Sequence, residues 1–172
     1  MENLGNMSKP TVALIKGYCV GGGCELAAFA DIRIATPDAQ FGVPAARLGI
    51  SIGYQEMRRL VQLVGIGNAS YMLLSARMLD AQEALRIGLV NQVVPQEEID
   101  DYTSKLVKSM ATLAPIALKD NKEIIRTVLA DPDLGGLTPE QQALPYRVFD
   151  TEDFAEGRRA FVEKRRPMFK GR

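Results

Sequence analysis

The sequence contains no histidine among its 172 residues. This absence removes the usual general base of enzymes, the commonest zinc ligand and every Ser-His-Asp or Cys-His arrangement within one chain. Any acid–base chemistry must therefore use Glu, Asp, Lys, Tyr or Cys side chains with shifted pKa values, or backbone groups that act electrostatically.

The sequence also has no excess of either charge, because 21 basic side chains balance 21 acidic ones. Affinity for a polyanion depends on surplus Lys and Arg, so we expect no nucleic-acid partner. The longest apolar runs are far short of a membrane span, and the N-terminal stretch MENLGNMSKP lacks the pattern of a secretory signal. Two cysteines are too few for a disulfide framework. These features predict a protein of the reducing cytoplasm with no membrane association.

Strand patterns occupy the first third of the sequence. The stretch TVALI is expected to form a strand covered on both faces, and DIRIA and AQFGV are expected to form two more. Residues 24–30 should form a short buried helix whose only charge is Glu25. Because so few strands cannot satisfy one another's backbone groups, we expect that the beginning of the domain is missing.

Helical patterns occupy most of the remaining sequence. A helix from Tyr54 should stop at Gly65 and Gly67, with a second helix over residues 70–74. Capping residues and apolar spacing predict further helices that begin near Asp80, Ile99, Pro115, Pro139 and Asp153, the last of them reaching about Arg165.

Three consecutive glycines, at positions 21–23, precede the helix that carries Glu25. They do not form a Walker-type phosphate loop, because Gly23 and Cys24 stand where that loop needs Lys and Ser or Thr. They match a dinucleotide fingerprint poorly, because Leu26 stands where its third glycine belongs. Cys24 has no histidine to serve as its base and only one other cysteine as a metal partner, so we expect a packing residue and no metal site.

Two interpretations of the triplet remain. In the first, a glycine exposes its backbone N–H at the helix start, where it can hold a carbonyl oxygen beside Glu25. In the second, the glycines only allow a strand and a helix to pack closely, and Glu25 is an ordinary charge in the first turn. Burying a lone carboxylate costs free energy or raises its pKa, so an acid on so apolar a helix favours the first interpretation.

The sequence resembles the enoyl-CoA hydratase/isomerase, or crotonase, family. The resemblance is carried by KPTVALIKGYCVGGGCELAAFADIRIATPDAQFGVPAARLGI, ARMLDAQEALRIGLVNQVVP and EGRRAFVEKRRPMFK. It implies an α/β protein of the ClpP/crotonase fold that lacks the N-terminal strands, together with the loop that supplies the family's other oxyanion-hole N–H. The implied division is a remnant of the crotonase core with the glycine turn, residues 1–95, and a C-terminal helical oligomerisation region, residues 96–172.

The resemblance also implies roles for individual residues. The N–H of Gly22 would donate to the thioester carbonyl of an acyl-CoA substrate and stabilise an enolate, while Glu25 would move a proton or activate water. Phe161 and Lys164 match the positions from which the family's closing helix reaches the CoA nucleotide of a neighbouring subunit. The implied enzyme acts in fatty acid metabolism as a hydratase, isomerase or related lyase, needs no cofactor beyond the CoA thioester substrate, and forms a homo-trimer or a hexamer.

Two departures from the family pattern favour an alternative: the missing N-terminal strands with their loop, and the residue at position 45. Ala45 occupies the position of the second catalytic glutamate, and alanine cannot transfer a proton. Glu56 or Tyr54 could supply a substitute polar group, or Glu56 could be an exposed charge in a first helical turn. The alternative is a truncated or degenerate, non-catalytic chain that binds CoA or assembles with homologous subunits.

Overall fold

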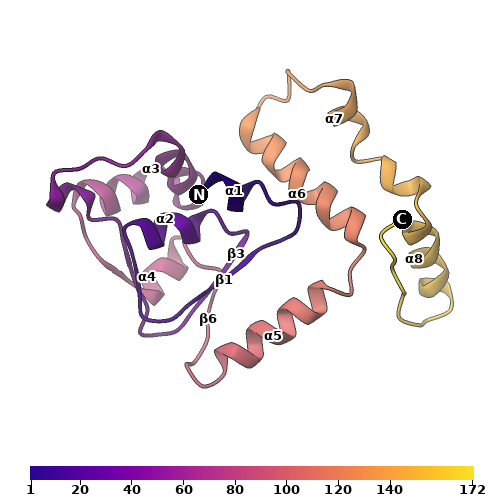
Figure 1. Cartoon of the computed structure of the whole chain (residues 1–172), viewed down its shortest axis with the longest axis horizontal. Coiled ribbons are helices and arrows are strands. Elements are labelled where there is room, and N and C mark those ends of the chain that lie inside the picture. Colours follow the sequence, from indigo (N-terminus) through magenta and orange to yellow (C-terminus); the bar gives the residue numbers. More distant parts are fainter. The chain divides into compact units, whose positions relative to one another are not determined.

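The structure is a computed structural model that describes residues 1–172, the side chain of Glu2 excepted. It contains two compact units (Figure 1). The first comprises residues 1–7 and 11–105, and the second comprises residues 8–10 and 106–172.

Two small sheets form the centre of the first unit. In one, β1 (Val12–Ile15), β3 (Ile32–Ala35) and β6 (Gln92–Val93) are parallel and lie in the order β1-β3-β6. In the other, β4 (Gln40–Gly42) pairs in parallel with β2 (Tyr18–Val20) and antiparallel with β5 (Leu79–Asp80). The strands expected in TVALI, DIRIA and AQFGV are confirmed.

The burial of two strands differs from expectation. TVALI was predicted to be covered on both faces, but in β1 only Ile15 is buried and Leu14 is 40% exposed, because β1 is an edge strand of its sheet. The apolar and polar residues of DIRIA alternate in the sequence, which predicts a strand with one exposed face, but Arg33, Ile34 and Ala35 are all buried. Arg33 tolerates burial because its Nε donates to the Leu89 carbonyl at 2.7 Å and its Nη1 donates to the Ala30 carbonyl at 2.5 Å. Burial lowers the pKa of Arg33 to about 10.

The helices of the first unit cover these strands. They are α1 (Glu2–Gly5), α2 (Gly22–Ala28), α3 (Tyr54–Leu74) and α4 (Ala81–Arg86), with a 3₁₀ turn, η1, at Ala45–Leu48. Buried side chains of α2 and α3, among them Cys24, Ala28, Leu60 and Val64, share one core cluster with Phe41 of β4.

The helix starts and stops follow local chemistry. The expected cap of α4 is present, because the Asp80 carboxylate accepts the Glu83 N–H at 2.8 Å. The expected break in α3 is confined to Gly65, whose φ of 75° and ψ of 159° are not helical. A second helical segment follows the kink at Gly65 and ends at Leu74, as expected, but it begins earlier than residue 70 because helical dihedrals resume directly after Gly65.

The second unit is helical. It contains α6 (Pro115–Ala130), α7 (Pro139–Ala143), the 3₁₀ turn η2 (Arg147–Asp150) and α8 (Glu152–Val162), while α5 (Ile99–Met110) crosses the boundary between the units. The capping box expected at α7 is confirmed, with the Thr138 hydroxyl and the Gln141 side chain each accepting a backbone N–H of the other residue. The helix α8 ends at Val162, before the expected Arg165, because Lys164 takes a left-handed φ of 54°. Within the part of the chain that the structure describes, no helix is both long and apolar enough to cross a bilayer.

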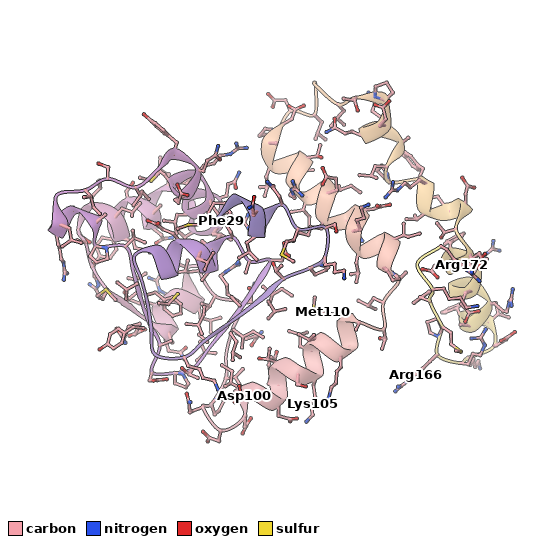
Figure 2. All side chains as sticks on the ribbon, in the orientation of Figure 1. Phe29, Asp100, Lys105, Met110, Arg166 and Arg172 are labelled. Carbon is pink, nitrogen blue, oxygen red and sulfur yellow. The ribbon has the colours of Figure 1, made fainter. Side chains whose placement is uncertain are left out.

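A buried carboxylate fixes the C-terminal tail of this unit. Asp153 lies in the first turn of α8 and is 3% exposed. Its two oxygens accept the backbone N–H groups of Lys170 at 2.6 Å and Gly171 at 2.9 Å. The tail therefore runs back along α8 to Arg172, which Figure 2 labels beside that helix.

We predict that Asp153→Ala lowers the free energy of unfolding by about 2 kcal/mol, because it leaves two backbone N–H groups without their acceptor. The matched control is Asp150→Ala, because Asp150 is an exposed aspartate at the end of η2, and this change should alter stability little. Urea unfolding followed by circular dichroism measures both. Equal midpoints for the two variants would contradict this account of the tail.

Candidate active site

The site begins with a sharp turn between β2 and α2. Gly21 follows β2 directly and has a φ of 57° and a ψ of −126°, a conformation that glycine adopts far more readily than other residues. Its N–H donates to the Gly42 carbonyl at 2.8 Å, which ties the turn to β4. The chain therefore passes from strand to helix at one fixed residue.

The next residue, Gly22, carries a backbone donor that the fold leaves unused. Gly22 is the first residue of α2, and N–H groups of a first helical turn have no partner within their helix. No residue that the structure describes accepts a hydrogen bond from the Gly22 N–H, and Gly22 is exposed. A side chain added there would meet only Met1 Cε, at 4.0 Å. The donor is thus free to bind an external oxygen.

Glu25 lies three residues later in the same helical turn. Its own N–H is bound to the Gly21 carbonyl at 3.0 Å, which fixes its backbone relative to Gly22. Burial raises the pKa of Glu25 above its usual value, and the negative charge of Glu56 raises it further. The expectation that α2 is buried needs correction, because Leu26 is 47% exposed and Glu25 is only half-buried. The helix buries one face, with Cys24 and Ala28 on it, and the carboxyl lies at the border of that face.

The structure brings Glu56 toward Glu25. Glu56 lies in the first turn of α3, and it is half-buried where an exposed charge was one of the expectations. Tyr54, two residues earlier, is 94% exposed and extends into solvent. Ala45 lies at the start of η1, half-buried against the core. Sequence spacing named Glu56 together with Tyr54 but could not choose between them, because the electrostatic interaction with Glu25 depends on how α3 packs against α2.

The two cysteines pack inside the first unit. Both are buried, and their side chains share a hydrogen bond. That bond and burial raise the pKa of the Cys24 thiol well above its ordinary value, which disfavours a nucleophilic thiolate. Among the described residues, no group of three or more Cys, Asp or Glu side chains is placed to hold a metal ion.

A cavity of about 350 Å³ lies beside the turn. Its lining includes the strand β1, Cys19 of β2, and Gly23, Leu26 and Ala27 of α2. Gly22 and Glu25 are not among its lining residues, so they lie next to this space along α2 without forming its wall.

The other two predicted site residues belong to the second unit. Phe161 is 85% exposed near the end of α8 and also borders a largely apolar cavity of about 450 Å³ with Phe154 and Phe169. Lys164 follows the helix end, and its N–H donates to the Phe161 carbonyl at 3.3 Å. The short link between them places both at the same end of α8.

Comparison with known proteins identifies the family of this chain. The sequence profile described as Enoyl-CoA hydratase/isomerase matches residues 1–172. The chain belongs to the enoyl-CoA hydratase/isomerase family. It has the α/β crotonase fold of that family.

Relatives in this family include two named hydratases. A short-chain-enoyl-CoA hydratase of Clostridium acetobutylicum is 40% identical, over 93% of this chain and 61% of the relative. A 2,3-dehydroadipyl-CoA hydratase of Escherichia coli is 39% identical, over 96% of this chain and 64% of the relative. The crystal structure of an enoyl-CoA hydratase/carnithine racemase from Magnetospirillum magneticum matches with a TM-score of 0.93 and 35% identity, over 99% of this chain and 63% of that protein. This family member therefore spans about six-tenths of the length of these relatives.

We predict that the pKa of Glu25 lies above 4.5, its ordinary value, because burial and the charge of Glu56 both disfavour the carboxylate. The folded chain then binds the Glu25 proton more tightly than the unfolded chain, so the associated stability is present below pH 4.5 and is lost as pH rises through the raised pKa. Carbon-13 NMR of labelled glutamate, assigned with Glu25→Gln, measures the titration. A midpoint at or below 4.5 would contradict the assignment.

Proposed function

We propose that this chain acts on an acyl-CoA thioester through an enolate, with the Gly22 N–H as oxyanion donor and Glu25 as acid–base. The observation that carries the proposal is an unpaired N–H at the start of α2 with a carboxyl of raised pKa in the same helical turn. Membership of the enoyl-CoA hydratase/isomerase family and the names of the relatives support the substrate class.

The two groups divide the chemistry between them. Removing a proton from the carbon beside a thioester carbonyl, or adding water to the β-carbon of an enoyl thioester, places negative charge on the carbonyl oxygen, and a positioned N–H stabilises that charge by roughly 3 kcal/mol. A carboxyl with a raised pKa is protonated more often near neutral pH, so it can give a proton to the carbon atom and take one back. Hydration, isomerisation and a related lyase step all use this pair.

The second unit supplies the proposed contacts to CoA and to other subunits. Phe161 offers an exposed ring, and Lys164 offers a charge at the same end of α8 for the CoA nucleotide. We infer that residues 96–172 carry these contacts in a homo-trimer or a hexamer, and that residues 1–95 are the C-terminal part of a crotonase core. Coverage of only 61% of one hydratase relative is consistent with a missing segment.

A second function is favoured by two specific observations. Ala45 provides no proton, and this chain is shorter than its relatives. A non-catalytic protein that binds CoA or joins homologous subunits would keep the fold without turnover. Activity measurements separate it from the enzyme.

We predict that the chain hydrates crotonyl-CoA and that Gly22→Pro reduces the rate roughly 100-fold to 1,000-fold, because proline removes the proposed donor. Proline is tolerated at the first residue of a helix, so α2 should persist. Loss of the conjugated-thioester absorbance measures the rate.

The control for this test is Gly22→Ala. Alanine keeps the N–H, and its Cβ would meet only Met1 Cε at 4.0 Å, so activity should stay within about tenfold of the unsubstituted protein. Equal activity of the proline and alanine variants would overturn the role of Gly22. No turnover by the unsubstituted protein, with CoA still bound, would support the non-catalytic function.

We predict that Phe161→Ala and Lys164→Ala each weaken CoA binding about tenfold, because the first removes a stacking surface and the second a phosphate-binding charge. Calorimetric titration at two salt concentrations measures both, and only Lys164→Ala should reduce the salt dependence. Tyr146→Ala, at an aromatic position that is 66% exposed in the same unit, is the matched control. Unchanged affinity in both test variants would exclude this end of α8 as the CoA site.

A further inference from the structure

Glu56 lies in the first turn of α3, a helix whose buried side chains share a core cluster with α2. Glu56, Leu60 and Val64 are four residues apart, so they share one face of the helix. Leu60 is 0% exposed and Val64 is 5% exposed, and both belong to the core cluster that includes Cys24 and Ala28 of α2. Glu56 extends this buried face by one turn and is itself half-buried.

A hydrogen bond fixes the two helices against each other one turn further along. Arg59 Nε donates to the Ala28 carbonyl at 2.8 Å. Arg59 lies three residues after Glu56, and Ala28 lies three residues after Glu25. Each carboxyl thus lies one helical turn before a residue of this hydrogen bond on its own helix, and the charge of Glu56 acts on the Glu25 carboxyl.

The residue before α3 leaves room for the Glu56 carboxylate. A Cβ built on Gly53 would lie 2.4 Å from Glu56 Oε2, so the carboxylate occupies the space that a larger residue would fill. Gly53 has a φ of −69° and a ψ of 159°, which any residue can adopt. The position can therefore be changed to alanine without backbone strain, and the change would displace the carboxylate.

We propose that Glu56 is the second carboxylate of this site and serves as the base that activates water, opposite Glu25 and in place of the side chain that Ala45 lacks. This inference rests on the proposed function, because it assigns a partner to Glu25 in the same reaction. It assigns the role to α3, whereas the family resemblance places the second glutamate at position 45.

The step balances with these groups alone. Glu56 takes a proton from water as the water oxygen bonds to the β-carbon of an enoyl-CoA. The electron pair of the carbon–carbon double bond moves into the thioester, and the resulting enolate oxygen accepts from the Gly22 N–H. Glu25 then gives its proton to the α-carbon, and the proton on Glu56 passes to Glu25 to restore the starting state.

The electrostatics of the pair agree with this division. Burial and the charge of Glu56 raise the pKa of Glu25, which favours the protonated form that gives its proton to the α-carbon. Two further titratable groups belong to the same helices: Arg59, half-buried and bound to the Ala28 carbonyl, and the buried thiol of Cys24, on which the Glu25 charge acts.

Two substitutions test the proposal in the full chain. Glu56→Gln should lower crotonyl-CoA hydration at least 100-fold, because the base is lost. It should leave deuterium exchange at the α-carbon of butyryl-CoA within about fivefold, because that exchange needs only Gly22 and Glu25. Gly53→Ala should lower hydration about tenfold by displacing the carboxylate. Glu83→Gln is the matched control, since Glu83 occupies the third position of α4 as Glu56 does in α3, and it should change neither rate.

A third readout does not depend on turnover. Glu56→Gln should shift the Glu25 titration to lower pH, measured by carbon-13 NMR, because it removes the neighbouring charge. An unshifted titration, or hydration that survives Glu56→Gln, overturns the role of Glu56 while the proposed function stands. If the unsubstituted protein catalyses deuterium exchange but no hydration, the role of Glu56 is likewise overturned while the proposed function stands. Absence of both reactions in the unsubstituted protein overturns the proposed function, and the role of Glu56 with it.

Discussion

The site depends on one hydrogen bond, from the Gly21 N–H to the Gly42 carbonyl at 2.8 Å. This bond fixes Gly21, the only residue of the glycine triplet with a positive φ, and it uses the Gly21 N–H to join the turn to β4. The Glu25 N–H is committed to the Gly21 carbonyl, so Gly22 lies between two fixed neighbours with its own donor unused. A single turn thus produces both a free N–H and a carboxyl one helical turn away. Catalysis by backbone donors requires such fixed geometry, because the donor must not reorganise when charge develops.

The carboxyl chemistry depends on partial burial. A fully buried pair of carboxylates would be costly, and a fully exposed pair would titrate as ordinary glutamates. Glu25 in the first turn of α2 and Glu56 in the first turn of α3 are each half-buried, and the charge of Glu56 acts on Glu25. The bond between Arg59 and the Ala28 carbonyl joins the two helices. The same packing explains how a chain with Ala45 at the expected position of a second acid can still present two carboxyls.

Much of this could be predicted from local sequence patterns. The glycine turn, the strands at Val12–Ile15 and Ile32–Ala35, and the caps at Asp80 and Thr138 all follow from interactions within a few residues. Burial and pairing depend on residues far apart in sequence, and here the predictions were incomplete. The two-residue strand β5 carries too short a pattern to detect, and the burial of Arg33 depends on the carbonyl of Leu89. The proximity of Glu56 to Glu25 depends on the packing of α3, which no spacing rule describes.

The most direct test of the central claim is the amide chemical shift of Gly22 during titration with butyryl-CoA, measured on nitrogen-15-labelled protein. The account predicts a large downfield shift of the Gly22 amide proton as the thioester oxygen binds it. The Gly21 amide should move little, because it is already bound to the Gly42 carbonyl. Saturable binding of butyryl-CoA with no change at Gly22 would contradict the account.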